Sequence, residues 1–183
     1  MKVHGMIGSV WKAVFAQIDL KDATIEILDG TTPTANSVEV KIGEGNLTYT
    51  ERRNIEYTLD RGLLDEVREG DEVPLEVRTD FIWEYLRGSL VSTSVPTVEE
   101  AIKNIGNAAA WVSTDSDACR PYAVDLRVTY APTPWTCGDQ EVITIQDFRY
   151  EQLDHDLRAG TVSMTGRANV TEATVVRSAQ SSS

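Results

Sequence analysis

Asp154, His155 and Asp156 place an imidazole between two carboxylates, residue types that bind metal ions or act as general bases. In a strand the side chains alternate, so His155 would face away from both aspartates. In a turn the three would converge, but no second His or Cys lies near in sequence to complete a metal site. We interpret the triplet as a polar turn or a solvated face, with a metal site and a catalytic role as the alternatives.

Other candidate sites are weaker. The acidic run from Asp65 to Glu72 lacks the ligand spacing of a calcium loop and is interpreted as a solvated turn. The serines between 89 and 94 sit in no nucleophile elbow. Cys119 and Cys137 form no CxxC pair and are too few for a disulfide scaffold, although they would pair if their strands were neighbours. We therefore expect no catalytic site, no metal and no cofactor.

The charge balance limits the kinds of molecule that this chain is expected to bind. Of 183 residues, 29 are acidic and 17 are Lys or Arg, which gives a net charge of −12. Tight nucleic-acid binding needs cations that neutralise phosphates, so this chain is not expected to grip DNA. No apolar run approaches a membrane span, and Lys12 interrupts the mildly apolar N-terminus, so no signal peptide is expected.

Alternating apolar and polar residues dominate the pattern and predict half-buried strands. Turn residues such as Asp29-Gly30 and Cys137-Gly138-Asp139 separate them. The predicted strands lie at Thr24–Leu28, Val38–Ile42, Leu47–Thr50, Ile55–Leu59, Val73–Val77, Tyr122–Tyr130, Val142–Ile145 and Val162–Val170.

One helix is well marked. Thr97 and Glu100 have the spacing of a capping box. Val98, Ala101, Ile102 and Ile105 then form an apolar stripe, which Gly106 ends. A weaker helical turn is predicted at Phe81–Leu86. The pattern predicts one mainly β (α+β) domain over 1–177, with an N-terminal arm over about 1–20 and a disordered serine-rich tail at 178–183.

Several sequence segments resemble those of the tail tube (major tail) proteins of long-tailed bacteriophages, and the resemblance covers roughly residues 25 to 177. The segments are Ile42–Glu51, Tyr57–Gly62, Gly70–Val77 and Gly160–Val170. The resemblance implies two packed antiparallel sheets forming a barrel-like sandwich with one flanking helix over about 97–105. It places Asp154-His155-Asp156 in a turn between two C-terminal strands.

The resemblance also implies a function. Six copies would form a ring whose inner strands join in one β-barrel, and the rings would stack into a virion tail tube. DNA would pass through an acidic lumen without specific binding during ejection, since like charges repel. The implied partners are further copies of the chain, a tape measure protein, a tail terminator and baseplate or tail-tip proteins, with assembly in the host cytoplasm and no membrane.

By the same analogy, loops and the N-terminal segment would contact neighbouring rings or subunits. The residues expected in these contacts are Gly30, Thr31, Thr32, Pro33, Thr34, Glu44, Asn46, Arg52, Arg53 and Trp11. The alternatives are a head–tail connector or tail terminator that forms a single ring, and a metal-binding β domain that uses His155. A carbohydrate-binding sandwich would need an exposed aromatic row, and only Trp83 and Tyr85 have that spacing.

Overall fold

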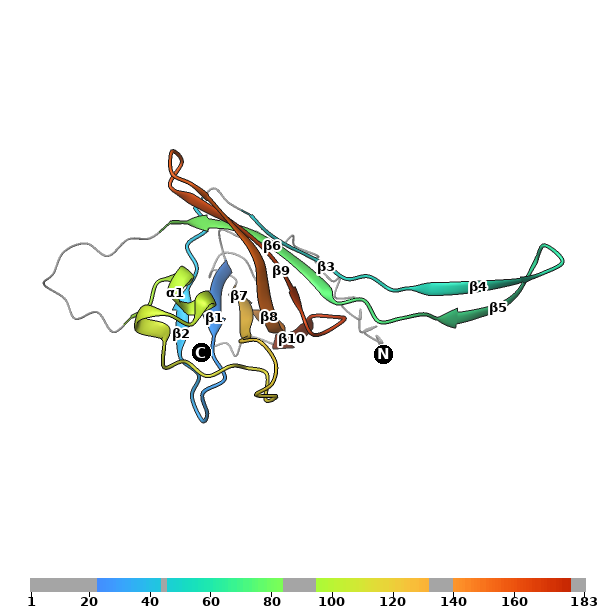
Figure 1. The fold of residues 1–183 in the computed structure, drawn as a ribbon, viewed down its shortest axis with the longest axis horizontal. Coiled ribbons are helices and arrows are strands. Elements are labelled where there is room, and N and C mark those ends of the chain that lie inside the picture. Colours follow the sequence, from blue (N-terminus) through green and yellow to red (C-terminus); the bar gives the residue numbers. More distant parts are fainter. Residues whose placement is uncertain (1–22, 44–45, 84–94, 132–139, 179–183) are drawn as a thin grey trace, which may run out of the picture.

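The computed structural model describes residues 23–43, 46–83, 95–131 and 140–178. Its strands pair antiparallel throughout, in an eight-stranded and a two-stranded sheet (Figure 1). No helix of the described residues is long and apolar enough to cross a membrane. The elements are β1 (Ala23–Leu28), β2 (Ser37–Glu39), β3 (Leu47–Thr50), β4 (Ile55–Asp60), β5 (Leu63–Glu69), β6 (Leu75–Ile82), α1 (Val98–Lys103), the 3-10 helix η2 (Gly106–Ala108), β7 (Val124–Tyr130), β8 (Gln140–Asp156), β9 (Thr161–Ala168) and β10 (Thr174–Ser178).

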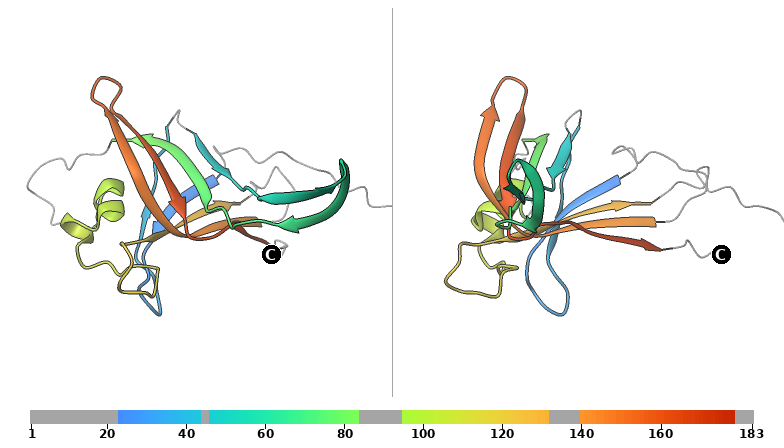
Figure 2. Two further views of the ribbon diagram at one scale, coloured as in Figure 1. Left: turned by 45° about the vertical axis from the view of Figure 1, so that its right-hand side comes forward. Right: turned by 90° about the vertical axis from the view of Figure 1, so that its right-hand side faces the viewer.

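The long strand β8 divides the large sheet into two halves. Its first part pairs with β7 and β10, and its second part pairs with β9. Between them Asp147 adopts a positive φ and the register shifts at Tyr150, features that bend a strand. We call β2-β1-β7-β8-β10 the back half-sheet and β8-β9-β6-β3 the front half-sheet. The strands of the two halves cross at a steep angle (Figure 2).

The core lies between the two half-sheets. Phe81, Val162 and Met164 of the front half share one buried cluster with Ile27 and Leu126 of the back half. The predicted mainly β fold, with sandwich-like antiparallel sheets and one flanking helix, is thus confirmed. The strands of the described residues do not close into a barrel within this single chain.

Helix α1 begins as the sequence predicts. The Thr97 hydroxyl accepts from the Glu100 N–H at 3.3 Å, and the Glu100 carboxylate accepts from the Thr97 N–H at 3.0 Å. The helix ends earlier than predicted, because Asn104 adopts the left-handed conformation before Gly106 is reached. Ile105 therefore leaves the apolar stripe and is 49% exposed. That part of the prediction was wrong.

Two further predictions need correction. Phe81 and Ile82 are the end of strand β6 and form no helical turn; residues 84–86 lie outside the described residues. The acidic run after Asp65 is largely strand, since β5 extends to Glu69. Strand β10 and the second part of β8 were not predicted. The N-terminal segment, residues 132–139 and the terminal serines also lie outside the described residues.

Candidate assembly surface

Asp154, His155 and Asp156 are the last residues of β8, and the turn follows at 157–160, so their placement in the turn itself was wrong. The His155 ring packs edge-on against Trp83, with centroids 5.3 Å apart, and its Nε2 lies 3.3 Å from Oε1 of Glu99. Asp156 accepts the N–H groups of the two residues at 158 and 159. Strand alternation thus separates the imidazole from the carboxylates, and the triplet's contacts are structural.

Metal-ligating residues are not gathered elsewhere either, as far as the described chain extends. No group of three or more His, Cys, Asp or Glu side chains there is placed to hold a metal ion. Cys119 is exposed, and its possible partner Cys137 lies outside the described residues.

The most distinctive feature is a hairpin formed by β4 and β5, which projects from the body (Figure 1). We call residues 55–69 the arm. Arg61 and Gly62 join its strands, both at positive φ, as a two-residue type I′ turn requires. Every residue of the two strands is exposed. An isolated two-stranded hairpin is marginally stable in water, and the described chain offers the arm no surface to pack on.

The two faces of the arm differ sharply. Cross-strand partners share a face, and the pairs Tyr57–Val67 and Leu59–Leu64 are apolar. On the opposite face Glu56 pairs with Arg68, with an ion pair of 2.6 Å, and Thr58 pairs with Glu66. Leu63 beside the turn pairs with Asp60 on this face and is its apolar exception. The apolar face consists of Ile55, Tyr57, Leu59, Leu64 and Val67, which are 47–69% exposed.

The apolar face of the arm continues the alternation of side chains that begins in strand β3 of the body. In β3, Leu47 and Tyr49 pack against the core, and the apolar residues of β4 keep the same odd-numbered alternation. In the body, the back half-sheet covers the core-facing side of the front half-sheet. Along the arm, no part of the described chain covers the corresponding stripe. Exposed apolar patches of this kind mark interaction sites for other proteins or membranes, or ligand-binding grooves.

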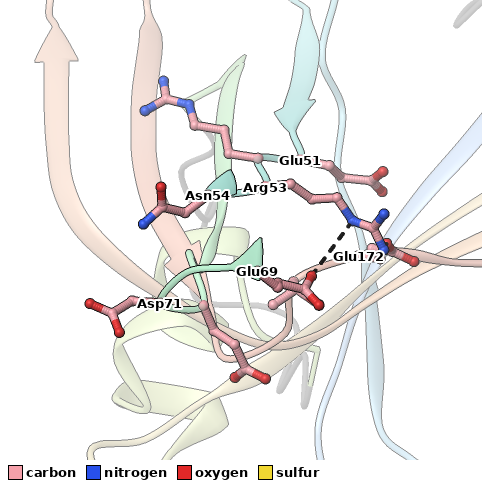
Figure 3. A pocket seen from close by; sticks show the side chains of 9 residues that line it. Glu51, Arg53, Asn54, Glu69, Asp71 and Glu172 are labelled. Atoms are coloured by element: carbon pink, nitrogen blue, oxygen red, sulfur yellow. Dashed lines mark ion pairs between the residues drawn. The ribbon is translucent and has the colours of Figure 1, made fainter. Parts of the chain in front are cut away.

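The base of the arm is polar and fixed to the body (Figure 3). The Gly70 N–H donates to the Asn54 carbonyl at 2.8 Å, which holds the two chains of the arm together. Arg53 reaches toward Glu69 at 4.0 Å and Glu172 at 3.7 Å. These groups line an open hollow rich in carboxylates, namely Glu51, Glu69, Asp71, Glu72 and Glu172.

The outer face of the front half-sheet is polar apart from Ile82, which is 40% exposed at the end of β6. The Ser163 hydroxyl donates to Asp80 at 2.5 Å, and the Gln152 amide donates to Asp154 at 2.6 Å. Carboxylates and guanidinium groups alternate across this face, so it is well solvated but carries both signs of charge. Its side chains are Thr48, Thr50, Glu76, Arg78, Asp80, Gln152, Asp154, Ser163, Thr165 and Arg167.

The front half-sheet also has two unpaired edges among the described residues. Strand β3 pairs only with β6, and β8 beyond Phe148 pairs only with β9. Four antiparallel strands place edges of opposite direction on the two sides. A copy related by rotation could therefore add its β3 to this β8 and continue the antiparallel order.

The residues predicted for assembly contacts lie in separate places. Gly30 to Thr34 belong to the β1–β2 loop, which Asp29 holds to the body by accepting from Thr31, Asn36 and Val112. Burial raises the pKa of Asp29, but these hydrogen bonds together outweigh it and hold the pKa below its usual value. Gly30 also lies so close to the Ser113 carbonyl that a Cβ would meet the oxygen at 2.2 Å. The hydrogen bonds of Asp29 and the close packing at Gly30 thus hold the loop against the body.

The other predicted residues divide between the arm base and undescribed segments. The carbonyl of Asn46 accepts from the Asp80 N–H at 2.9 Å beside β6. Arg52 pairs with Glu76 at 3.2 Å, and Arg53 lies at the arm base. Trp11 and Glu44 lie outside the described residues. Contacts between copies through all of these residues remain predictions.

Sequence reasoning missed the arm's apolar face. The usable signal was the alternation from Ile55 to Leu59, followed by Arg61-Gly62 and a second run from Leu63. Such a pattern predicts a hairpin with a two-residue turn. The acidic residues Asp65, Glu66 and Glu69 hid the second strand.

No family model matches the sequence, and no curated protein matches it. Among solved structures, a chain of the anti-feeding prophage baseplate, determined by cryo-EM and six-fold symmetrised, aligns with a TM-score of 0.44 and 8% identity. The alignment covers 90% of this chain and 97% of that chain. This likeness is too distant to assign a family or a function.

Proposed function

We propose that this protein is a structural subunit of a phage tail, whose copies assemble into stacked rings of a tail tube. The observation that carries the proposal is the arm, which presents five large apolar side chains on one face without a covering layer in the described chain. Burying such a side chain is worth about 1.5–3 kcal/mol. Association with further copies is the simplest way to gain that energy. The sequence segments that resemble tail tube proteins support the same role.

The front half-sheet supports the closed ring of this proposal. Its two unpaired edges run in opposite directions, so neighbouring copies would extend one antiparallel sheet around the ring. Closure would remove exposed edges, which otherwise invite aggregation. The polar outer face would then line the channel. With charges of both signs and many hydroxyl groups, it would let DNA pass without holding it.

The proposed role is structural and requires no catalytic residue or cofactor. The partners would be copies of this chain, with a tape measure protein, a tail terminator and baseplate or tail-tip proteins at the ends of the tube. The virion tail would be its location.

The test removes the arm without opening the body. Asn54 and Gly70 are already hydrogen-bonded, so an Asn-Gly turn can replace residues 55–69. We expect this variant to fold, with circular dichroism and hydrogen exchange of the body unchanged, but to form no tubes in electron micrographs. Single rings that fail to stack would place the arm between rings. Long tubes formed by the variant at wild-type concentrations would contradict the proposal.

A further inference from the structure

The apolar face of the arm requires a covering strip of defined character. β4 is a strand of six residues, about 20 Å long at ~3.4 Å per residue. Between residues 51 and 72 the chain carries eight carboxylates and four arginines, so the arm and its base are net acidic. A suitable strip would be apolar on one side, cationic, and long enough to run along the arm.

Residues 1–22 match this description better than the other segments outside the described structure. Residues 84–94 and 132–139 are attached to the body at both ends, and 179–183 have the sequence AQSSS. Residues 1–22 carry three lysines and two aspartates, and both aspartates lie among the last four residues, so the first eighteen carry Lys2 and Lys12 and no carboxylate. They also contain Val10, Trp11 and Phe15, which supply large apolar side chains close together in the chain.

The N-terminal segment is long enough to reach a neighbouring copy. It joins the described chain at Ala23, the first residue of β1 in the back half-sheet. Twenty-two residues span up to about 70 Å when extended. Four strands at ~4.8 Å spacing make a front half-sheet only about 19 Å wide, so a neighbouring copy lies well within that reach.

We propose that residues 1–22 of one copy bind along the apolar face of the arm of a neighbouring copy. Apolar side chains around Trp11 cover Tyr57, Leu59 and Val67, and the lysines lie near the carboxylates of the arm and its base. This inference rests on the proposed function, because only an assembly supplies the neighbouring arm. It makes the N-terminal segment a clasp between copies.

Disulfide cross-linking between two populations tests the inference. Both carry Cys119→Ser and Cys137→Ser; one adds Phe15→Cys and an affinity tag, and the other adds Tyr57→Cys. They are mixed before assembly and oxidised with copper phenanthroline. We expect a disulfide-linked dimer of tagged and untagged chains in the assembled fraction. The matched control is Thr58→Cys, on the opposite face of the same arm, and we expect its cross-linking yield to be at least fivefold lower.

Two further measurements keep the test decisive if a cysteine variant fails to fold or assemble. Hydrogen exchange of residues 55–69 in assembled wild-type protein should be slowed at least tenfold relative to the dispersed chain, and deletion of residues 1–17 should remove that protection. Assembly with equal cross-linking at Tyr57→Cys and Thr58→Cys, or with none at either and unprotected arms, would overturn the clasp alone. A link formed within one chain that carries both Phe15→Cys and Tyr57→Cys, without dimers, would also overturn it. Failure of the wild type to assemble would overturn the proposed function as well.

Discussion

Asp115 connects two parts of the fold through its hydrogen bonds. Asp115 accepts from Arg149 at 2.6 Å, from Arg120 at 3.3 Å and from the Asp117 N–H at 3.0 Å. The backbone hydrogen bond from Asp117, followed by the bond from Arg149, lowers the pKa of Asp115 to about 2. The residue therefore ties the loop before β7 to strand β8 as a carboxylate.

Loss of this carboxylate should appear as a pH dependence. A depressed folded-state pKa means that the unfolded chain binds the proton more tightly, so the stabilisation is present above about pH 4 and is lost as the pH falls toward 2. We expect Asp115→Asn to lower the Tm at pH 7 and to flatten the fall in Tm between pH 4 and 2. Thermal unfolding across that range measures both. A wild-type-like slope in the variant would contradict the assignment.

Gly166 shows how closely the front half-sheet is packed. A Cβ at this position would lie 2.2 Å from the Arg149 carbonyl oxygen and 2.7 Å from the Phe148 ring. We expect Gly166→Ala to reduce the free energy of unfolding by about 1–3 kcal/mol, the usual cost of overpacking. Its neighbour Thr165 lies on the outer, polar face, so Thr165→Ala is the control and should change little. Urea denaturation compares the two, and equal stabilities would refute the packing argument.

At the scale of elements, local chemistry predicted some structure well. The capping box placed the start of α1 correctly, and Leu47–Thr50 matches β3 residue for residue. Long-range packing decided what was missed. β5 is charged because the arm leaves the body, so burial imposes no alternating pattern there. The last part of β8 is polar because its residues from Tyr150 to Asp156 are exposed on both faces, with only Leu153 partly buried.

The two faces of the arm allow a matched pair of variants. We expect Leu59→Asn with Leu64→Asn to raise the concentration needed for assembly at least tenfold, because apolar contacts worth more than 1.4 kcal/mol are lost. Thr58→Asn with Glu66→Asn alters the opposite face and should assemble as the wild type does. Both variants should unfold within about 0.5 kcal/mol of wild type as dispersed chains, since all four positions are exposed. Light scattering against concentration reads the assembly. Equal behaviour of the two pairs would exclude the apolar face from the contact.

At the scale of the whole molecule, the net charge of −12 opposes association of copies. In the proposed assembly, the apolar arm and the unpaired sheet edges would have to overcome that repulsion. At 0.1 M salt, repulsion between exposed charges more than about 10 Å apart is largely screened, whereas apolar contacts persist.

Assembly should therefore depend on salt. We expect the concentration required for assembly to fall as sodium chloride is raised from 0.02 to 0.5 M, a change that sedimentation velocity can follow. Dissociation of assemblies on raising the salt would indicate that ion pairs, and not apolar contacts, hold the copies together.

The central claim is that copies of this chain build a tube. Negative-stain electron microscopy of the purified protein over a range of concentrations tests it most directly. We expect rings with a central channel that stack into tubes as concentration rises. Single rings that never stack would favour a connector or terminator role, and a dispersed monomer at every concentration would contradict the claim.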